Sequence, residues 1–100
     1  MSQIRVVLPY HLRNLARLDG DLLVEVDGIV SPNTILNRIE ADYPMLKGTI
    51  REYVTGKRRA WLRFFACQED ISHEPMDSQL PNAISTGNEP FIIIGAIAGG

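Results

Sequence analysis

Gly99 and Gly100 are the residues of this chain whose type and spacing most strongly suggest chemistry. They follow the apolar run 91–94 and a segment of small residues that includes Ala96 and Ala98. Glycine has no Cβ, so such a segment can extend through a slot too narrow for other side chains. We interpret residues 96–100 as a reactive tail that presents a carboxylate at Gly100. The competing interpretation is a frayed terminus, because chain ends are often poorly ordered.

Other patterns of catalytic residues are weak. The sequence contains no glycine-rich phosphate loop and no nucleophile elbow. Cys67 is the only cysteine, so neither an internal disulfide nor a cysteine-based zinc site is expected. His11 and His73 lie outside any metal-binding motif, and His73 next to Glu74 is a weak acid–base signal. We therefore predict that the chain is not itself an enzyme and binds no metal or cofactor of its own.

Length and charge limit the classes of protein to which this chain could belong. A chain of 100 residues predicts one domain, residues 1–100. The formal net charge of −2 argues against a nucleic-acid-binding protein, which usually carries a basic domain. No apolar run approaches the roughly 20 residues that a membrane-spanning helix needs. The first residues also lack the apolar core of a signal peptide. We expect a cytoplasmic protein that contacts neither nucleic acid nor membrane.

Hydrophobic alternation predicts the strands that must position the tail. Residues 3–8 and 22–27 alternate apolar and polar side chains and predict an antiparallel pair. The aromatic-rich segment 61–67 predicts a third strand. The almost wholly apolar segment 91–97 predicts a last, central strand buried on both faces. Residues 70–87 contain two prolines and predict a loop with a short turn or strand.

Helical signals occupy the middle of the chain. Ser31 followed by Pro32 is typical of a helix start, because serine caps the first turn and proline suits the first helical position. Apolar residues then recur at helical spacing until Pro44 ends the helix. Residues 46–56 predict a second helical stretch, and residues 10–16 a short helical turn or loop. The apolar positions of the second stretch are Leu46, Ile50, Tyr53 and Val54, with Gly56 as its stop.

This order of elements predicts an α+β fold with one mixed sheet of four to five strands packed on one main helix. The ubiquitin-like β-grasp is such an arrangement. In it the first and last strands lie side by side at the centre of the sheet. The C-terminal tail, residues 96–100, then extends from the end of the sheet.

One face of the predicted sheet has the composition of a binding surface. Alternation in the third strand places Arg63 and Phe65 on the face away from the helix, together with Arg5 and Val7 of the first strand. Exposed aromatic and arginine side chains are typical of interface hot spots. We therefore predict that these four residues bind a partner. The alternative is that loops cover the aromatic side chains.

Three segments of the sequence carry a family resemblance: residues 7–9 with 12–16, residues 36–44 at the end of the main helix, and residues 94–100 with the terminal Gly-Gly. Through these segments and its order of elements, the chain resembles the MoaD/ThiS family of sulfur carrier proteins over nearly its whole length. The chain departs from the family pattern at three places. Cys67-Gln68 stands where an asparagine is common, residues 87–90 replace a Gly-Asp turn, and Gly95 replaces a proline.

The resemblance implies a function in which Gly100 is a substrate. An E1-like adenylating enzyme would activate the Gly100 carboxylate with ATP and magnesium, which belong to that partner. A persulfide or rhodanese-type sulfur donor would then leave a thiocarboxylate. A sulfur-accepting synthase, such as a molybdopterin synthase large subunit, would receive the sulfur. Gly99 is implied to act beside Gly100, and Ile97 and Ala98 to contact the partner.

Several readings remain open at this stage. The recipient pathway is molybdenum cofactor, thiamine or cysteine synthesis, and the length together with residues 12–16 favours the molybdopterin or cysteine type. One alternative function is a ubiquitin-like modifier conjugated through Gly100. Another is a β-grasp interaction module with an inert tail. An enzyme that uses Cys67 or His73 is the least favoured alternative.

Overall fold

Five strands form one mixed sheet in the computed structural model of the chain, which describes residues 1–95. The strand order across the sheet is β2-β1-β5-β3-β4. β1 and β5 run parallel at the centre, and the other neighbouring pairs are antiparallel. The strands are β1 (Ser2–Val7), β2 (Leu22–Val26), β3 (Leu62–Ala66), β4 (Glu69–Asp70) and β5 (Phe91–Gly95). The predicted pairing of the first and last strands is confirmed.

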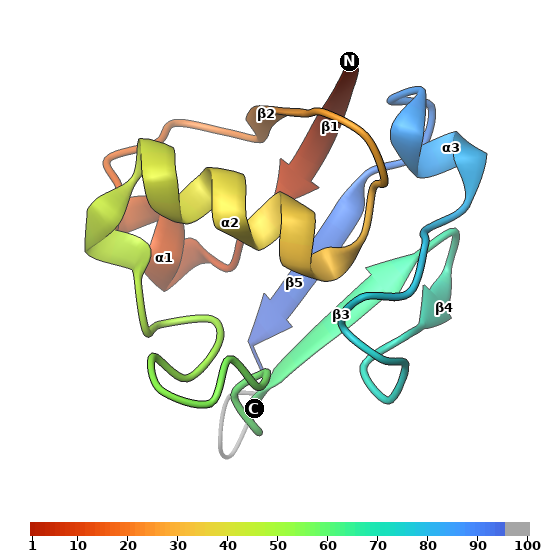
Figure 1. Ribbon diagram of the computed structural model, residues 1–100. Coiled ribbons are helices and arrows are strands. Elements are labelled where there is room, and N and C mark those ends of the chain that lie inside the picture. The colour runs from red at the N-terminus through yellow and green to blue at the C-terminus, as the bar shows by residue number, and fades with distance from the viewer. Residues whose placement is uncertain (96–100) are drawn as a thin grey trace.

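The helices lie over one face of this sheet, with α2 crossing in front of it in Figure 1. They are α1 (Tyr10–Leu15), α2 (Pro32–Asp42) and α3 (Asn82–Ser85), with a short 3-10 helix η1 (Pro44–Leu46). α2 is the predicted main helix, and α1 is the predicted short helix at residues 10–16. Within residues 1–95, no helix has the length and apolar character needed to cross a membrane.

The start of α2 is held by a reciprocal cap. The Thr34 N–H donates to Ser31 Oγ at 3.2 Å, and the Ser31 N–H donates to Thr34 Oγ1 at 2.8 Å. Pro32 occupies the first turn, where a missing N–H costs nothing. The helix ends at Asp42, just before Pro44, as the sequence predicts. Its position is therefore set by local chemistry at both ends.

The hydrophobic core lies between α2 and the inner face of the sheet. At the centre, the Phe64 and Phe91 rings pack with their centroids 5.2 Å apart. Side chains from four strands and from α2 are almost fully buried here. They include Ile4, Val6, Val24, Ile35, Leu36, Ile39, Leu62, Phe64, Phe91 and Ile93. The alternation in β1, β2 and β3 thus predicts their inner faces correctly.

The predicted helix at residues 46–56 is wrong. After η1, the chain forms turns and an isolated bridge between Arg51 and Arg58. Gly48 has a φ of +81°, a left-handed conformation that ends any helix at this point. Tyr53 and Val54, which the helical spacing assigned to a buried stripe, are strongly exposed.

The last strand is central, but the prediction that it is buried on both faces is wrong. Phe91 and Ile93 face the core, whereas Ile92 is half-buried and Ile94 is 46% exposed. The reason is that the helices cover only one face of the sheet. The strand is described to Gly95, and the predicted strand residues 96 and 97 lie outside the described residues.

The segment predicted as a loop with a short turn or strand, residues 70–87, contains a short helix that was not predicted. α3 is a single turn in which the Ile84 N–H donates to the Pro81 carbonyl at 3.0 Å. Its one anchor is Ile84, which is fully buried against the core. Such a short helix has no amphipathic repeat from which to predict it.

The hairpin between β3 and β4 turns through two residues in an unfavourable conformation. Cys67 and Gln68 have φ values of +51° and +68°, and they connect the paired residues Ala66 and Glu69. Two-residue hairpin turns with positive φ at both positions strongly favour Asn-Gly. A side chain in the left-handed region costs roughly 1–2 kcal/mol.

We therefore expect Gln68→Gly to raise the free energy of unfolding by about 1 kcal/mol, because glycine adopts this φ without a Cβ clash. The matched control is Gln79→Gly in a loop where φ is not positive. It should lower stability slightly, because it adds freedom to the unfolded chain. Urea denaturation measures both. Equal effects of the two substitutions would contradict strain at the hairpin.

Candidate functional site

The sheet face opposite α2 carries a continuous strip of apolar side chains. The strand register places Val7 beside Ile92, and Ile92 beside Phe65, so three central strands contribute neighbouring residues. All three side chains are half-buried. Ile94 and Leu23 extend the strip and are 46% and 55% exposed. We name this surface the outer face; it comprises Arg5, Val7, Leu23, Arg63, Phe65, Asp70, Ile92 and Ile94.

The four sheet residues predicted to bind a partner all lie on this outer face. They are Arg5, Val7, Arg63 and Phe65. Ile92 and Ile94 belong to the same surface and were missed, because the apolar run of β5 was interpreted as buried on both sides. Their alternation with Phe91 and Ile93 was the signal that places them there. The other predicted site residues, Ile97, Ala98, Gly99 and Gly100, lie outside the described residues.

Arg5 has a structural contact on this face. Its Nε donates to the carbonyl of Gly87 at 2.8 Å, and its Nη2 donates to the carbonyl of Asn88 at 2.9 Å. Gly87 has a φ of +81°, and a Cβ there would approach the Gln3 carbonyl to 3.3 Å. Arg5 therefore ties β1 to the turn that precedes β5, and its guanidinium is largely engaged.

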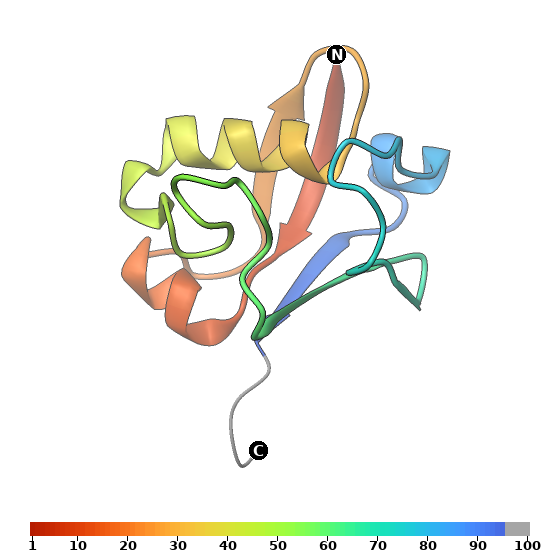
Figure 2. The same ribbon diagram turned by 60° about the horizontal axis from the view of Figure 1, so that its bottom comes forward.

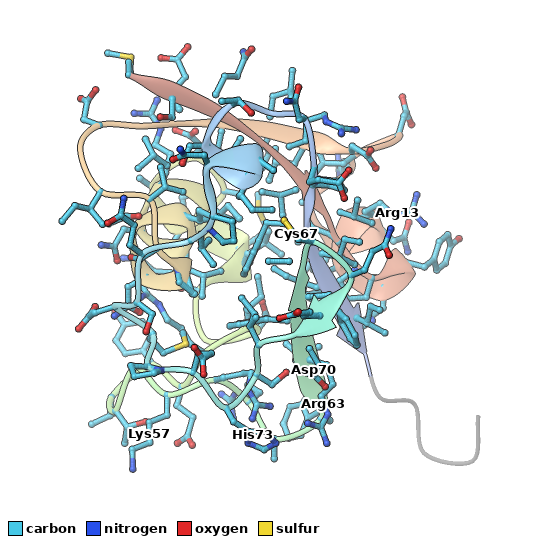
Figure 3. All side chains as sticks on the ribbon, turned by 90° about the vertical axis from the view of Figure 1, so that its right-hand side faces the viewer. Arg13, Lys57, Arg63, Cys67, Asp70 and His73 are labelled. Atoms are coloured by element: carbon cyan, nitrogen blue, oxygen red, sulfur yellow. The ribbon has the colours of Figure 1, made fainter. Side chains whose placement is uncertain are left out.

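Arg63 and Asp70 form the charged pair of the outer face. Arg63 Nη1 lies 3.5 Å from Asp70 Oδ2, and both side chains remain substantially exposed; Figure 3 shows them side by side. The Ser72 N–H donates to Asp70 Oδ1 at 2.9 Å. Hydrogen bonds from Ser72, and then the charge of Arg63, lower the pKa of Asp70 below its ordinary value. Asp70 is thus ionised at neutral pH, and its pair with Arg63 lies at the rim of the apolar strip.

The last described residue of β5, Gly95, lies between two neighbouring elements. Leu62 at the start of β3 pairs with it, and Figure 2 shows the two strand ends meeting. A Cβ on Gly95 would lie 3.5 Å from His11 Cε1 and 3.8 Å from Pro9 Cβ. The end of β5 therefore adjoins the start of α1 as well. His11, which lies outside any metal-binding motif in the sequence, is exposed at this junction.

Two cation–π pairs involve residues next to this junction. The Arg13 guanidinium lies 5.7 Å from the centre of the Tyr10 ring, and the Arg59 guanidinium lies 5.5 Å from the Trp61 ring. Both rings are more than half exposed. Each contact contributes roughly 0.5–1 kcal/mol at an exposed site. They hold two aromatic side chains in fixed positions beside the end of β5.

Cys67 and His73, the residues of the disfavoured enzyme alternative, are not brought together. Cys67 lies in the hairpin turn, half-buried against the core, and His73 is exposed. Figure 3 shows them well apart. Within residues 1–95, no three His, Cys, Asp or Glu side chains gather as they would around a metal ion.

The strand order, the parallel central pair and the helix across one face define a ubiquitin-like β-grasp fold. The fold implied by the resemblance to MoaD/ThiS proteins is thereby confirmed. No protein-family model matches the sequence, and no curated protein matches it as a relative.

Three solved structures share the fold over nearly the full length. Small archaeal modifier protein 1 of Haloferax volcanii is 13% identical with a TM-score of 0.76, covering 97% of this chain and 100% of that one. The same-named protein of Methanosarcina acetivorans is 21% identical with a TM-score of 0.73, covering 100% and 98%. A chain of the Amycolatopsis orientalis BexX/CysO complex is 18% identical with a TM-score of 0.73, covering 96% and 98%.

The lowered pKa of Asp70 predicts a pH effect on stability. Because the pKa is lower in the folded than in the unfolded chain, ionised Asp70 stabilises the fold above the ordinary carboxyl pKa of about 3.9. That contribution is lost as the pH falls through the lower folded value. The stability difference between the wild type and Asp70→Asn should therefore shrink on acidification, as urea denaturation across pH would measure. An NMR titration midpoint for Asp70 at or above the ordinary value would contradict this.

Proposed function

We propose that this chain is a small sulfur carrier protein whose Gly100 carboxylate is adenylated by a partner enzyme and converted to a thiocarboxylate. The observation that chiefly supports the proposal is the β-grasp similarity over nearly the full length to small modifier proteins and to a chain of the BexX/CysO complex. The sequence adds the paired residues Gly99 and Gly100 at its last positions. On this proposal the chain is a protein substrate within a sulfurtransferase system.

The chemistry explains why a partner is required. A terminal carboxylate has a pKa of about 3.5, so at neutral pH it is an anion that resists nucleophiles. Attack of one carboxylate oxygen on the α-phosphorus of ATP forms an acyl adenylate and releases pyrophosphate. A persulfide sulfur then attacks the carbonyl carbon and AMP leaves. A thiol cleaves the resulting acyl disulfide, which leaves the thiocarboxylate on Gly100. ATP and magnesium act in the partner.

The outer face supplies the binding free energy that the tail lacks. Fixing Ile97 to Gly100 in a slot costs roughly 4–8 kcal/mol of backbone entropy. Apolar burial of about 160–320 Å² is needed merely to offset this, at about 25 cal/mol per Å². Two of these four residues have no side chain, so the tail alone binds poorly. In this proposal Phe65 and its apolar neighbours on the outer face dock first, and the tail is then presented.

The sulfur-accepting partner is proposed to be a synthase of the molybdopterin or cysteine type. The BexX/CysO structure supports the principle, because a chain of this fold there belongs to a complex with another protein. A carrier must visit an activating enzyme, a sulfur donor and an acceptor in turn. A single exposed outer face suits exclusive, sequential docking, because only one partner can cover it at a time.

The tail prediction tests the proposed function directly. After incubation with ATP, magnesium, a persulfide donor and a candidate activating enzyme, intact mass should rise by one oxygen-to-sulfur exchange. Deletion of Gly100 should abolish the increase, and Gly99→Ala should reduce it strongly, because a Cβ obstructs a narrow slot. Both variants should retain the native NMR spectrum of residues 1–95. A Gly100 deletion variant that still acquires sulfur would overturn the mechanism.

The outer-face prediction separates docking from chemistry. Phe65→Ala should weaken binding to the activating enzyme about tenfold or more, as expected for an aromatic hot spot. Ile29→Ala is the matched control, because Ile29 is an apolar residue 62% exposed outside the outer face. Titration calorimetry measures both variants. Equal affinities for the two would show that the partner docks elsewhere.

A ubiquitin-like modifier is the second candidate, favoured by the similarity to proteins named small archaeal modifiers. It shares the activation step but ends with an amide bond between Gly100 and a lysine of a target. Denaturing gels of protein isolated from its native cell distinguish the two. Covalent ladders that disappear on deletion of Gly100 indicate the modifier, and a free thiocarboxylate indicates the carrier.

A further inference from the structure

A small apolar groove opens beside β4, at the edge of the sheet away from β2. It encloses about 200 Å³. Its walls include Ile71, Leu80 and the rings of Pro32 and Pro81, and two carboxylates, Glu69 and Glu74, border it. We name this hollow the β4 groove. It shares no residue with the outer face.

The side chain of Glu69 points toward the groove side of the sheet. Glu69 pairs with Ala66, whose side chain is buried on the core-facing side, and cross-strand partners share a face. Asp70, by contrast, pairs with Phe65 on the outer face. β4 thus directs one carboxylate to each face of the sheet. Glu69 and Glu74 are both exposed.

Neither groove carboxylate is neutralised from within residues 1–95. Asp70 is paired with Arg63, but no ion pair to Glu69 or Glu74 is present in this part of the chain. No lysine or arginine follows Arg63 in the sequence, and Arg58, which reaches this loop, donates to the Ser72 carbonyl at 3.2 Å and forms no ion pair with either glutamate. The same stretch, residues 64–100, holds the acidic residues Glu69, Asp70, Glu74, Asp77 and Glu89. The groove therefore combines apolar walls with uncompensated negative charge.

Edge protection explains only half of this arrangement. A charge pointing inward on an edge strand prevents pairing with other chains, and Glu69 meets that description. Glu74 lies outside the strand, so protection of the edge does not account for it. A larger hollow, of about 340 Å³, lies between α2 and the loop after η1, but there Arg51 is already paired with Glu40 at 3.0 Å. A third hollow, of about 270 Å³, lies between β2 and α2, and there Arg38 lines the wall beside Glu25 and Asp27. Of these three hollows, the β4 groove is the one lined by carboxylates with no lysine or arginine among them.

We propose that the β4 groove binds an arginine or lysine side chain presented by a partner protein. Long basic side chains lay their apolar stems along hydrophobic surface and keep the charged head at the polar rim. Here the stem lies against Ile71, Leu80 and the proline rings, and the cation reaches Glu69 and Glu74. Because the proline rings are conformationally fixed, the groove walls lose little freedom on binding. The sign of the charge excludes acidic partners.

The test uses the full chain, labelled with ¹⁵N, and a short capped peptide of alternating arginine and alanine. Backbone amide signals of Ile71, Glu74 and Leu80 should shift on titration. The same peptide with glutamine in place of arginine should leave them unmoved. Glu69→Gln and Glu74→Gln should each weaken binding by about two- to fivefold, as for exposed ion pairs, and the effect should fade at high salt. Glu25→Gln, an exposed glutamate of β2 at the opposite sheet edge, is the matched control.

Three results would overturn the assignment. The arginine peptide could leave the groove amides unmoved, the glutamine peptide could shift them equally, or Glu25→Gln could weaken binding as much as the groove variants. Charge-to-amide substitutions on exposed side chains preserve the fold, which the same spectra verify. Because the proposal relies on no residue of the tail, a chain that fails to load sulfur would still pass or fail this test.

Discussion

The parallel pairing of β1 with β5 is the contact on which the rest of this structure depends. It joins the first and last strands, with Val6 beside Phe91 and Val7 beside Ile92. On the inner side, Phe91 packs against Phe64 and is fully buried, so the pairing contributes directly to the core. On the outer side, the same register completes the apolar strip. The contact closes a loop of more than eighty residues, an entropic cost of a few kcal/mol that the buried apolar residues along this seam offset.

The two faces of the sheet have different roles, because the inner face is covered and the outer face is open. α2 and the loops seal the inner face, so stability comes mainly from side chains that no partner reaches. The outer face keeps Ile92, Ile94 and Phe65 partly in water, at a cost in solubility that a monomer rarely bears without a binding role. Arg5 contributes to both roles. It lies on the outer face of β1, and its guanidinium binds the turn before β5. A substitution there would disturb the strand that carries the outer face as well as the surface itself.

Local signals in the sequence predicted the elements whose structure does not depend on packing against distant parts of the chain. Ser31 with Pro32 located the start of α2, and alternation located the inner faces of β1, β2 and β3. Prediction failed where the outcome depends on distant packing. An apolar run such as β5 has the same sequence pattern whether one face of the strand is covered or both. The helix that covers it is far away in the sequence. The spacing that suggested a helix after Leu46 was real, but Gly48 adopts a left-handed turn and leaves Tyr53 in solvent. The β4 groove was not predictable, since it requires Pro32 to meet residues 69–81.

Charge is distributed along the chain in a way that separates two kinds of contact. Every lysine and arginine lies within residues 1–63, and the rest of the chain carries only acidic charge. The outer face straddles this boundary and carries little net charge, because Asp70 matches Arg63 and the remaining charge is that of Arg5, whose guanidinium is bound by carbonyls. A partner bound there would be held mainly by apolar burial, which acts mainly on the dissociation rate and changes little with salt. A cation in the β4 groove would act by long-range attraction, which mainly raises the association rate and weakens as salt is added. A partner that used both surfaces would be attracted by one and retained by the other, and salt would separate the two contributions.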